Sequence, residues 1–397
     1  MTSVPSSPKI DSRIPWVDTA KAIGIGLVFY GHLVQHFIGL GVPAATDQMK
    51  WIYSFHMPFF FLLVGFVYKD RGLRFEKFLK RQVLTRLVPV WVFNLVGMGI
   101  WIVSEYLAGP SGWIERLGWA SLVRHCADEM FSVLVYGRPV WNTLTWFLTC
   151  LFTVEICQFV LHRLLRRSVY LTVSILCFGT LAVLMDYYAE AIHNVLGDRR
   201  HWWLVTSAAM ALMFYQLGIL LRRLGWLNAI ESRLSLCMLA AVLLAVSLLT
   251  FNLNHALNDR SVPVVLMIGA YYGNIWWFLL SSLAGIAAML YISQIFAANR
   301  VLTYLGQITL TLMCLDGILL DFVNPGAAAL LMRLHPEQNV WFFTALCLVC
   351  TVLSLLVCIP ANWLLERYLP FVIGRAGRPR APFPAATATA ADRAQSA

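Results

Sequence analysis

Ionisable side chains interrupt a long apolar stretch near the start of this sequence. The stretch AKAIGIGLVFYGHLVQHFIG, residues 20–39, is almost wholly apolar yet carries Lys21, His32 and His36. Ionisable groups in such a stretch are costly, and they usually face a cavity or the interior of a helix bundle. Histidine titrates near neutral pH, so a neutral ring can take a proton from a hydroxyl group. These residues are therefore the first candidates for chemistry.

His32 and His36 are four residues apart, which places them on one face of a helix. Two other interpretations remain open for them. A histidine in a membrane helix commonly hydrogen-bonds to a neighbouring helix, and two histidines at this spacing can share a zinc ion. Neither an adjacent glutamate nor an obvious third ligand accompanies them, so we expect no metal.

The composition is that of a membrane protein. Of 397 residues, 59% are hydrophobic and only 13% are charged, and the mean hydropathy is +0.70. Soluble domains carry roughly 25% charged residues, so about half of the usual charge is missing. We expect a polytopic integral membrane protein with an all-α fold.

Apolar runs of about 20 residues predict ten transmembrane helices. They are expected at residues 17–40, 51–68, 83–107, 141–162, 168–187, 202–221, 234–251, 274–296, 302–323 and 341–363. Because ten is an even number, both termini are expected on the same side of the membrane. No internal repeat relates the two halves of the chain.

The distribution of basic residues predicts which side that is. Segments on the side of the termini hold 21 lysine and arginine residues, whereas the alternate loops hold eight. By the positive-inside rule, both termini are therefore expected to be cytoplasmic. The same distribution accounts for the net charge of +10, so we expect no nucleic-acid partner.

The rise of an α-helix, about 1.5 Å per residue, converts these expected helices into depths. On this scale His32, His56 and Asp316 lie at a similar height, roughly 21–22 Å above the cytoplasmic surface, and form an upper polar layer. Asp316 can orient His32 as a general base there. Lys21 and Glu155 form a lower layer, in which they are expected either to pair or to act separately, with Lys21 guiding a ligand.

The segment YKDRGLRFEKFLKRQVLTR, residues 68–86, concentrates basic side chains after the second predicted helix. One interpretation is a cytoplasmic loop that lies on anionic lipid. The other is a docking surface for a phosphorylated ligand, whose phosphates arginine can bind through two parallel hydrogen bonds. The charges alone do not separate these two interpretations.

Several stretches in order along the chain resemble the membrane-bound acyltransferase 3 family, in its branch of fucose 4-O-acetylase-like and exopolysaccharide O-acetyltransferases. They are VDTAKAIGIGLVFYGH (17–32), SFHMPFFFLLVGF (54–66), FLKRQVLTRLVPVW (78–91) and WFLTCLF (146–152). The resemblance covers about residues 13 to 365, nearly the whole membrane region. FHMP and WFL are weak signals individually, but together and in order they are specific.

The family pattern places a basic residue, ten further residues and then a histidine on the first helix, and Lys21 and His32 match it. Lysine stands at position 21 where many members have arginine, a departure that the fucose-acetylase-like branch shares. Two further positions depart from the pattern. Asp316 stands where many members have histidine, and Thr149 replaces a proline that often follows WFL. The role expected for Asp316 therefore rests on its own chemistry and not on the family.

The resemblance implies transfer of an acyl group, usually acetyl, from cytoplasmic acetyl-CoA to a sugar hydroxyl at the outer face. It implies that His32 acts as general base or as a transient acyl carrier. The other expected catalytic residues are Lys21, beside the pantetheine arm, His56 and Asp316. The residues expected to bind the CoA phosphates are Arg74, Lys80, Arg81 and Arg86. Those expected to bind substrate are Trp146 and Glu155.

The expected organisation is a cytoplasmic N-terminal segment (1–14), an acyltransferase 3-like transmembrane domain (15–366) and a basic, then Ala/Pro-rich, disordered cytoplasmic tail (367–397). The resemblance implies a multi-pass protein of the bacterial inner membrane. Its expected partners are a glycan acceptor (a lipid-linked repeat unit or an exopolysaccharide), membrane lipids and glycan-assembly machinery.

A transporter or proton-coupled carrier is the alternative function, because such proteins also place histidines and carboxylates inside the membrane. Transporters of this kind favour internal repeats and paired helices broken by glycine or proline. Neither is visible in this sequence, so acyl transfer is the preferred interpretation.

Overall fold

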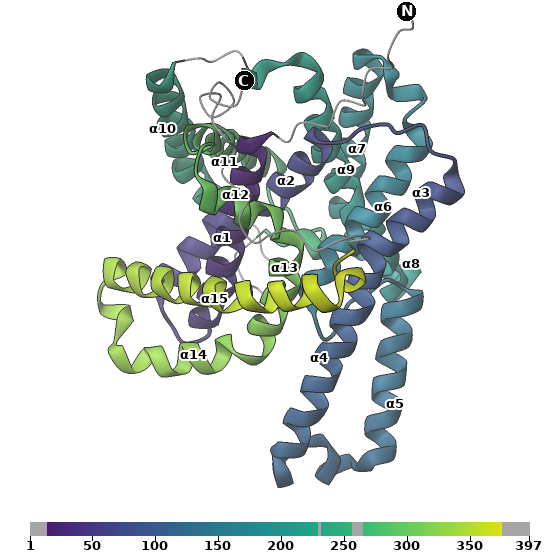
Figure 1. Ribbon diagram of the computed structural model, residues 1–397, viewed down its shortest axis with the longest axis vertical. Coiled ribbons are helices and arrows are strands. Elements are labelled where there is room, and N and C mark those ends of the chain that lie inside the picture. Colours follow the sequence, from purple (N-terminus) through teal and green to yellow (C-terminus); the bar gives the residue numbers. More distant parts are fainter. Residues whose placement is uncertain (1–13, 229–231, 256–264, 375–397) are drawn as a thin grey trace, which may run out of the picture.

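The computed structural model describes residues 14–228, 232–255 and 265–374, and its secondary structure within these ranges is helical apart from one isolated bridge between Leu266 and Tyr271. Nine helices in these ranges are long and apolar enough to cross a membrane. The expected all-α, polytopic membrane fold is thus confirmed (Figure 1).

The nine helices of membrane-spanning length include one that is continuous through a π-helical turn, Val83–Leu87, which joins α3 to α4. Their bounds are α1 (Pro15–Ile38), α2 (Pro43–Phe66), α3 with α4 (Phe75–Gln82 and Val88–Leu107), α6 (Trp146–Leu161), α7 (Ser168–Tyr187), α9 (Val205–Leu224), α10 (Arg233–Thr250), α11 (Ile275–Ile295) and α15 (Val340–Tyr368). The remaining helices are α5 (Trp113–Val135), α8 (Ala189–Leu196), α12 (Arg300–Gln307), α13 (Thr309–Phe322) and α14 (Asn324–Leu331).

The ninth predicted helix, 302–323, differs from the expectation because it is broken. Helices α12 and α13 meet at Ile308 with a bend of 74°. The first of them packs closely on α1, since a Cβ atom at Gly306 would lie 1.8 Å from the carbonyl oxygen of Asp18. If the bent pair counts as one span, the described residues hold up to ten spans, in the order that the sequence predicts.

Two regions at the ends of predicted helices also differ. The loop expected between 107 and 141 contains the 23-residue helix α5, which was missed because charged residues interrupt its apolar pattern. The tail expected from residue 367 begins as ordered structure: α15 continues to Tyr368, and Val372 and Ile373 are buried. Residues 1–13 and 375–397, where most of the two expected terminal segments fall, lie outside the described residues.

The centre of the bundle is formed by α1, α2 and α9, whose spans are mostly buried. Helices α2 and α9 approach so closely that glycine is required on both of them. A Cβ atom at Gly65 would lie 1.8 Å from the Tyr215 carbonyl oxygen, and one at Gly218 would lie 2.1 Å from that of Leu62. This contact fixes α2, and with it His56, relative to the rest of the bundle.

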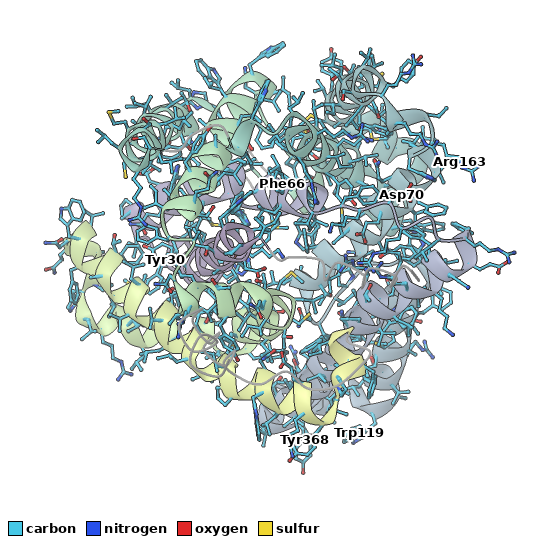
Figure 2. All side chains as sticks on the ribbon, turned by 45° about the horizontal axis from the view of Figure 1, so that its top comes forward. Tyr30, Phe66, Asp70, Trp119, Arg163 and Tyr368 are labelled. Atoms are coloured by element: carbon cyan, nitrogen blue, oxygen red, sulfur yellow. The ribbon has the colours of Figure 1, made fainter. Side chains whose placement is uncertain are left out.

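The outer helices α7, α10 and α15 expose long apolar side chains, among them Leu249 and Val357, which are 75% and 66% exposed. A soluble protein would hide such surfaces, but lipid covers them without cost. Figure 2 labels two aromatic residues on the rim of the molecule, Trp119 and Tyr368, both largely exposed. These exposed surfaces agree with a bundle that is embedded in a membrane.

The close crossing of α2 and α9 gives a test of the fold. Gly218→Ala should lower the melting temperature in detergent, because the new methyl group must displace backbone, and overpacking costs about 1–3 kcal/mol or more. Gly26→Ala is the matched control, since nothing lies within 4 Å of a Cβ atom there. Equal stability of the two variants after heating and gel filtration would show that the helices do not cross in this way.

Candidate active site

A cavity of about 1000 Å³, here named the histidine cavity, is lined by His32, His36 and His56 together with Trp146 and other residues. These side chains come from α1, α2 and α6, so three separate parts of the sequence meet at one space. His32 and His56 are 6% and 3% exposed, which shows that they belong to the interior of the bundle and not to its lipid-facing surface.

His32 makes a short contact with Asp316 on α13: its Nδ1 atom lies 2.6 Å from Oδ2 of the carboxylate. Asp316 is 1% exposed and lies outside the lining of the cavity, behind the ring of His32. A carboxylate accepts a hydrogen bond from Nδ1–H, which keeps the proton on Nδ1 and leaves the lone pair on Nε2. This geometry is that of an oriented general base.

His56 is held in the same tautomer by a different partner. Its Nδ1–H donates to the carbonyl oxygen of Ile52 at 2.9 Å, one turn earlier on α2. Its ring lies 4.6 Å from that of Tyr53, which in turn lies 6.4 Å from the ring of His32. Tyr53 donates its hydroxyl hydrogen to Gln35 at 3.1 Å. Sequence reasoning missed Tyr53, although its spacing of three residues from His56 puts both on one face of α2.

A second cavity of about 640 Å³, here named the basic cavity, is lined by Lys21, Arg81, Arg86 and Glu155, and also by Arg71 and Arg222. Arg86 binds Glu155 through two parallel hydrogen bonds, from Nε at 3.0 Å and from Nη2 at 3.1 Å. Lys21 instead lies 3.5 Å from Asp18. The suggested pair between Lys21 and Glu155 is therefore wrong, because each residue has a nearer partner of opposite charge.

The four residues expected to bind CoA phosphates do not all line this cavity. Arg81 and Arg86 do, whereas Arg74 and Lys80 are exposed on α3 and its N-cap, outside the lining. Tyr68 also lines the cavity, and burial, followed by the charges of Asp70 and Glu155, raises its pKa to about 12. The hydroxyl of Tyr68 thus keeps its proton at neutral pH and can donate it in a hydrogen bond.

Trp146 and Glu155, both expected to bind substrate, are separated by the structure. Trp146 lines the histidine cavity, whereas Glu155 lines the basic cavity about two and a half turns further along α6. The upper layer that the sequence predicts is brought together at one site, and the lower layer lies at another. Arg71 and Arg222 at the basic cavity were missed, because their charge does not distinguish them from other basic residues in these loops.

The two cavities approach each other within about one helical turn, or 5–6 Å. On α1, Lys21 lines the basic cavity and Ile25 lines the histidine cavity. At the break between α12 and α13, Gln307 lines the basic cavity and Thr309 lines the histidine cavity. The linings of the two cavities therefore come within about one turn of each other along α1 and across the break at Ile308.

A family model described as an acyltransferase domain, Acyl_transf_3, matches residues 14–359, which is nearly all of the membrane region. The chain belongs to the acyltransferase 3 family. No match was found among curated proteins or among solved structures. The protein is accordingly a membrane-bound O-acyltransferase with a multi-pass helical domain, and this activity implies an acyl donor.

The ion pair in the basic cavity of this acyltransferase gives a second test. Arg86→Gln and Glu155→Gln should be coupled in a double-mutant cycle of thermal stability by about 0.5–3 kcal/mol, as expected for residues in direct contact. Lys21→Gln combined with Glu155→Gln should instead be additive, because these two side chains bind other partners. Additivity of the first pair, or coupling of the second, would contradict the structure.

Proposed function

We propose that this acyltransferase moves an acetyl group from cytoplasmic acetyl-CoA to a sugar hydroxyl of a cell-surface or exported glycan. The observation that carries the proposal is the buried contact between His32 and Asp316, on the wall of a cavity that a second, basic cavity approaches within one turn. Family membership favours this activity over transport, which uses intramembrane histidines for other purposes.

The basic cavity suits the phosphates of the donor. Arg71, Arg81 and Arg222 present guanidinium groups there, and such groups bind phosphate oxygens in pairs. Lys21 stands at the inner end, eleven residues before His32 on α1, which is a rise of about 16 Å. The thioester arm would run along this distance past Lys21, with the acetyl group near His32.

The reaction then follows from the tautomer of His32. Its Nε2 removes the proton from the sugar hydroxyl while the hydroxyl oxygen forms a bond to the thioester carbonyl carbon. The carbon–sulfur bond breaks next, and the leaving thiolate takes the proton from Nε2, so that an ester and free CoA result. Asp316 stabilises the intermediate imidazolium, and general-base catalysis of this kind contributes about 10²–10⁴-fold. Direct acylation of His32 is the second route, which would produce ping-pong kinetics.

His56 and Trp146 supply the walls against which the acceptor rests. His56 presents Nε2 towards the interior because its Nδ1–H is held by Ile52, and Trp146 offers an indole face for the apolar side of a sugar ring. Under this proposal the protein lies in the bacterial inner membrane, where a lipid-linked repeat unit or an exopolysaccharide would reach the histidine cavity beside the glycan-assembly machinery.

Loss of the base tests the proposal directly. Purified His32→Ala should lose about 10²–10⁴-fold of its transfer of radiolabelled acetyl groups from acetyl-CoA to glycan isolated from the producing cell, measured as alkali-labile ester. His335→Asn is the control, since the side chain of His335 is exposed, lies outside both cavity linings and contacts Glu337. No acceptor-dependent label in the wild type, or unchanged label in His32→Ala, would contradict the proposal.

Asp316 acts through His32, so its replacement should have a different kinetic effect. Asp316→Asn should lower kcat with little change in either KM, because the asparagine amide no longer stabilises the imidazolium and can hold the ring in the wrong tautomer. It should also move the pH–rate profile of kcat, which a merely structural role would leave in place. An unchanged pH–rate profile, with a fall in activity that matches the loss of folded protein, would contradict the positioning role of Asp316.

Lys21 is expected to act on the donor alone. Lys21→Ala should raise the KM for acetyl-CoA severalfold and leave the KM for the glycan unchanged, as measured by initial rates. Lys77→Ala, which changes an exposed lysine of α3 outside the cavity lining, should leave both unchanged. A rise in the KM for the glycan would assign Lys21 to the other substrate.

A further inference from the structure

Three charged side chains line the histidine cavity in addition to its histidines. Glu129 comes from α5, Arg138 from the segment after it and Asp321 from α13. Within the described residues, no ion pair or side-chain hydrogen bond holds any of the three. In the basic cavity, by contrast, Arg86 is paired with Glu155.

These charges lie outward from the reactive pair. Asp321 follows Asp316 by five residues on α13, a rise of about 7–8 Å. His36 follows His32 by one turn on α1, and its Nε2 atom is buried without a hydrogen-bond partner. Glu129, Arg138 and Asp321 are here named the charged tier. Arg138 and Asp321 are exposed, so the charged tier also forms the entrance of the cavity. A ligand that passes the entrance therefore meets the charged tier before it meets His32.

The chemistry of this tier suits a sugar. Carboxylates accept hydrogen bonds from hydroxyl groups, and a guanidinium donates to hydroxyl oxygens. Tyr271 and Trp146 line the same cavity and offer aromatic faces to the C–H groups of a pyranose ring. An uncharged sugar ring needs polar contacts with the hydroxyl groups at its edge and aromatic contacts with the C–H groups of its face.

The balance of charge restricts the acceptor further. Two carboxylates and one guanidinium leave an excess of negative charge, in addition to Asp316 behind His32. Charges that line a cavity with apolar walls act strongly on a ligand inside it, and a like charge is disfavoured there. An acceptor unit that carries a carboxylate or a phosphate would thus be excluded.

We propose that Glu129, Arg138 and Asp321 bind the sugar unit of the acceptor and select one that carries no acidic group. The inference rests on the proposed function, because it takes the histidine cavity as the acceptor site. It assigns the three residues to recognition of the acceptor sugar. It also separates neutral from acidic glycans, which the proposed function alone does not.

The test compares matched sugars in a binding measurement that needs no chemistry. Purified protein in detergent is titrated with p-nitrophenyl glycosides of glucose, galactose and mannose, and with the corresponding uronides, which differ by one carboxylate. The wild type should bind at least one neutral glycoside about tenfold more tightly than its uronide, a difference of about 1.4 kcal/mol. Asp321→Asn and Glu129→Gln should each reduce this preference severalfold, and Arg138→Gln should weaken the neutral sugar.

Glu115→Gln is the matched control, since Glu115 lies on α5 but does not line the cavity. The inference is overturned if no glycoside binds, if the uronides bind as tightly as their neutral partners, or if the Asp321 and Glu129 variants keep the full preference. Transfer of labelled acetyl to native glycan is measured in the same preparations. A preference for neutral glycosides without acetyl transfer would support the sugar site and contradict the proposed function. Acetyl transfer without that preference would support the proposed function and contradict the sugar site.

Discussion

A short, buried contact between His32 and Asp316 joins α1 to α13 at the candidate active site. A buried carboxylate is costly unless a partner satisfies it, and at 2.6 Å the imidazole does so. Because α1 and α13 are far apart in sequence, the contact ties distant parts of the chain together. It also fixes the ring of His32 on the cavity wall. The same contact thus serves stability and reactivity: it holds two helices together and leaves one nitrogen free to accept a proton.

Around this contact, the bundle keeps two chemically different cavities apart by about one helical turn. The break at Ile308 contributes to this separation, because residues on its two sides face different cavities. At this position α12 and α13 meet with a bend of 74°. The close packing of Gly306 on the backbone at Asp18 holds the first half of the broken span in place. Under the proposed function, this arrangement lets the reacting groups meet while the two substrates remain on opposite sides of the membrane.

The sequence predicted the parts of this arrangement that depend on hydropathy and depth. The order of the spans was confirmed, and His32 and Asp316 do lie side by side, as their similar expected heights suggested. Depth alone does not give the rotation of a helix about its axis, and for that reason the alternative in which Lys21 pairs with Glu155 is wrong. The expectation that Arg74 and Lys80 bind CoA phosphates stays a prediction, and neither residue lines the basic cavity. Helix α5 and the charged tier with Arg138 and Asp321 were missed because charged residues weaken an apolar pattern.

Under the proposed function, the two substrates meet at His32 from opposite sides of the membrane. The most direct measurement uses sealed inside-out vesicles with glycan enclosed in the lumen and labelled acetyl-CoA added outside, compared with vesicles that hold both substrates on the same side. We expect ester formation only when the donor is on the side of the basic cavity and the glycan is on the side of the histidine cavity. Equal rates with donor and glycan on one side would contradict it, since a single cavity would then have to serve both.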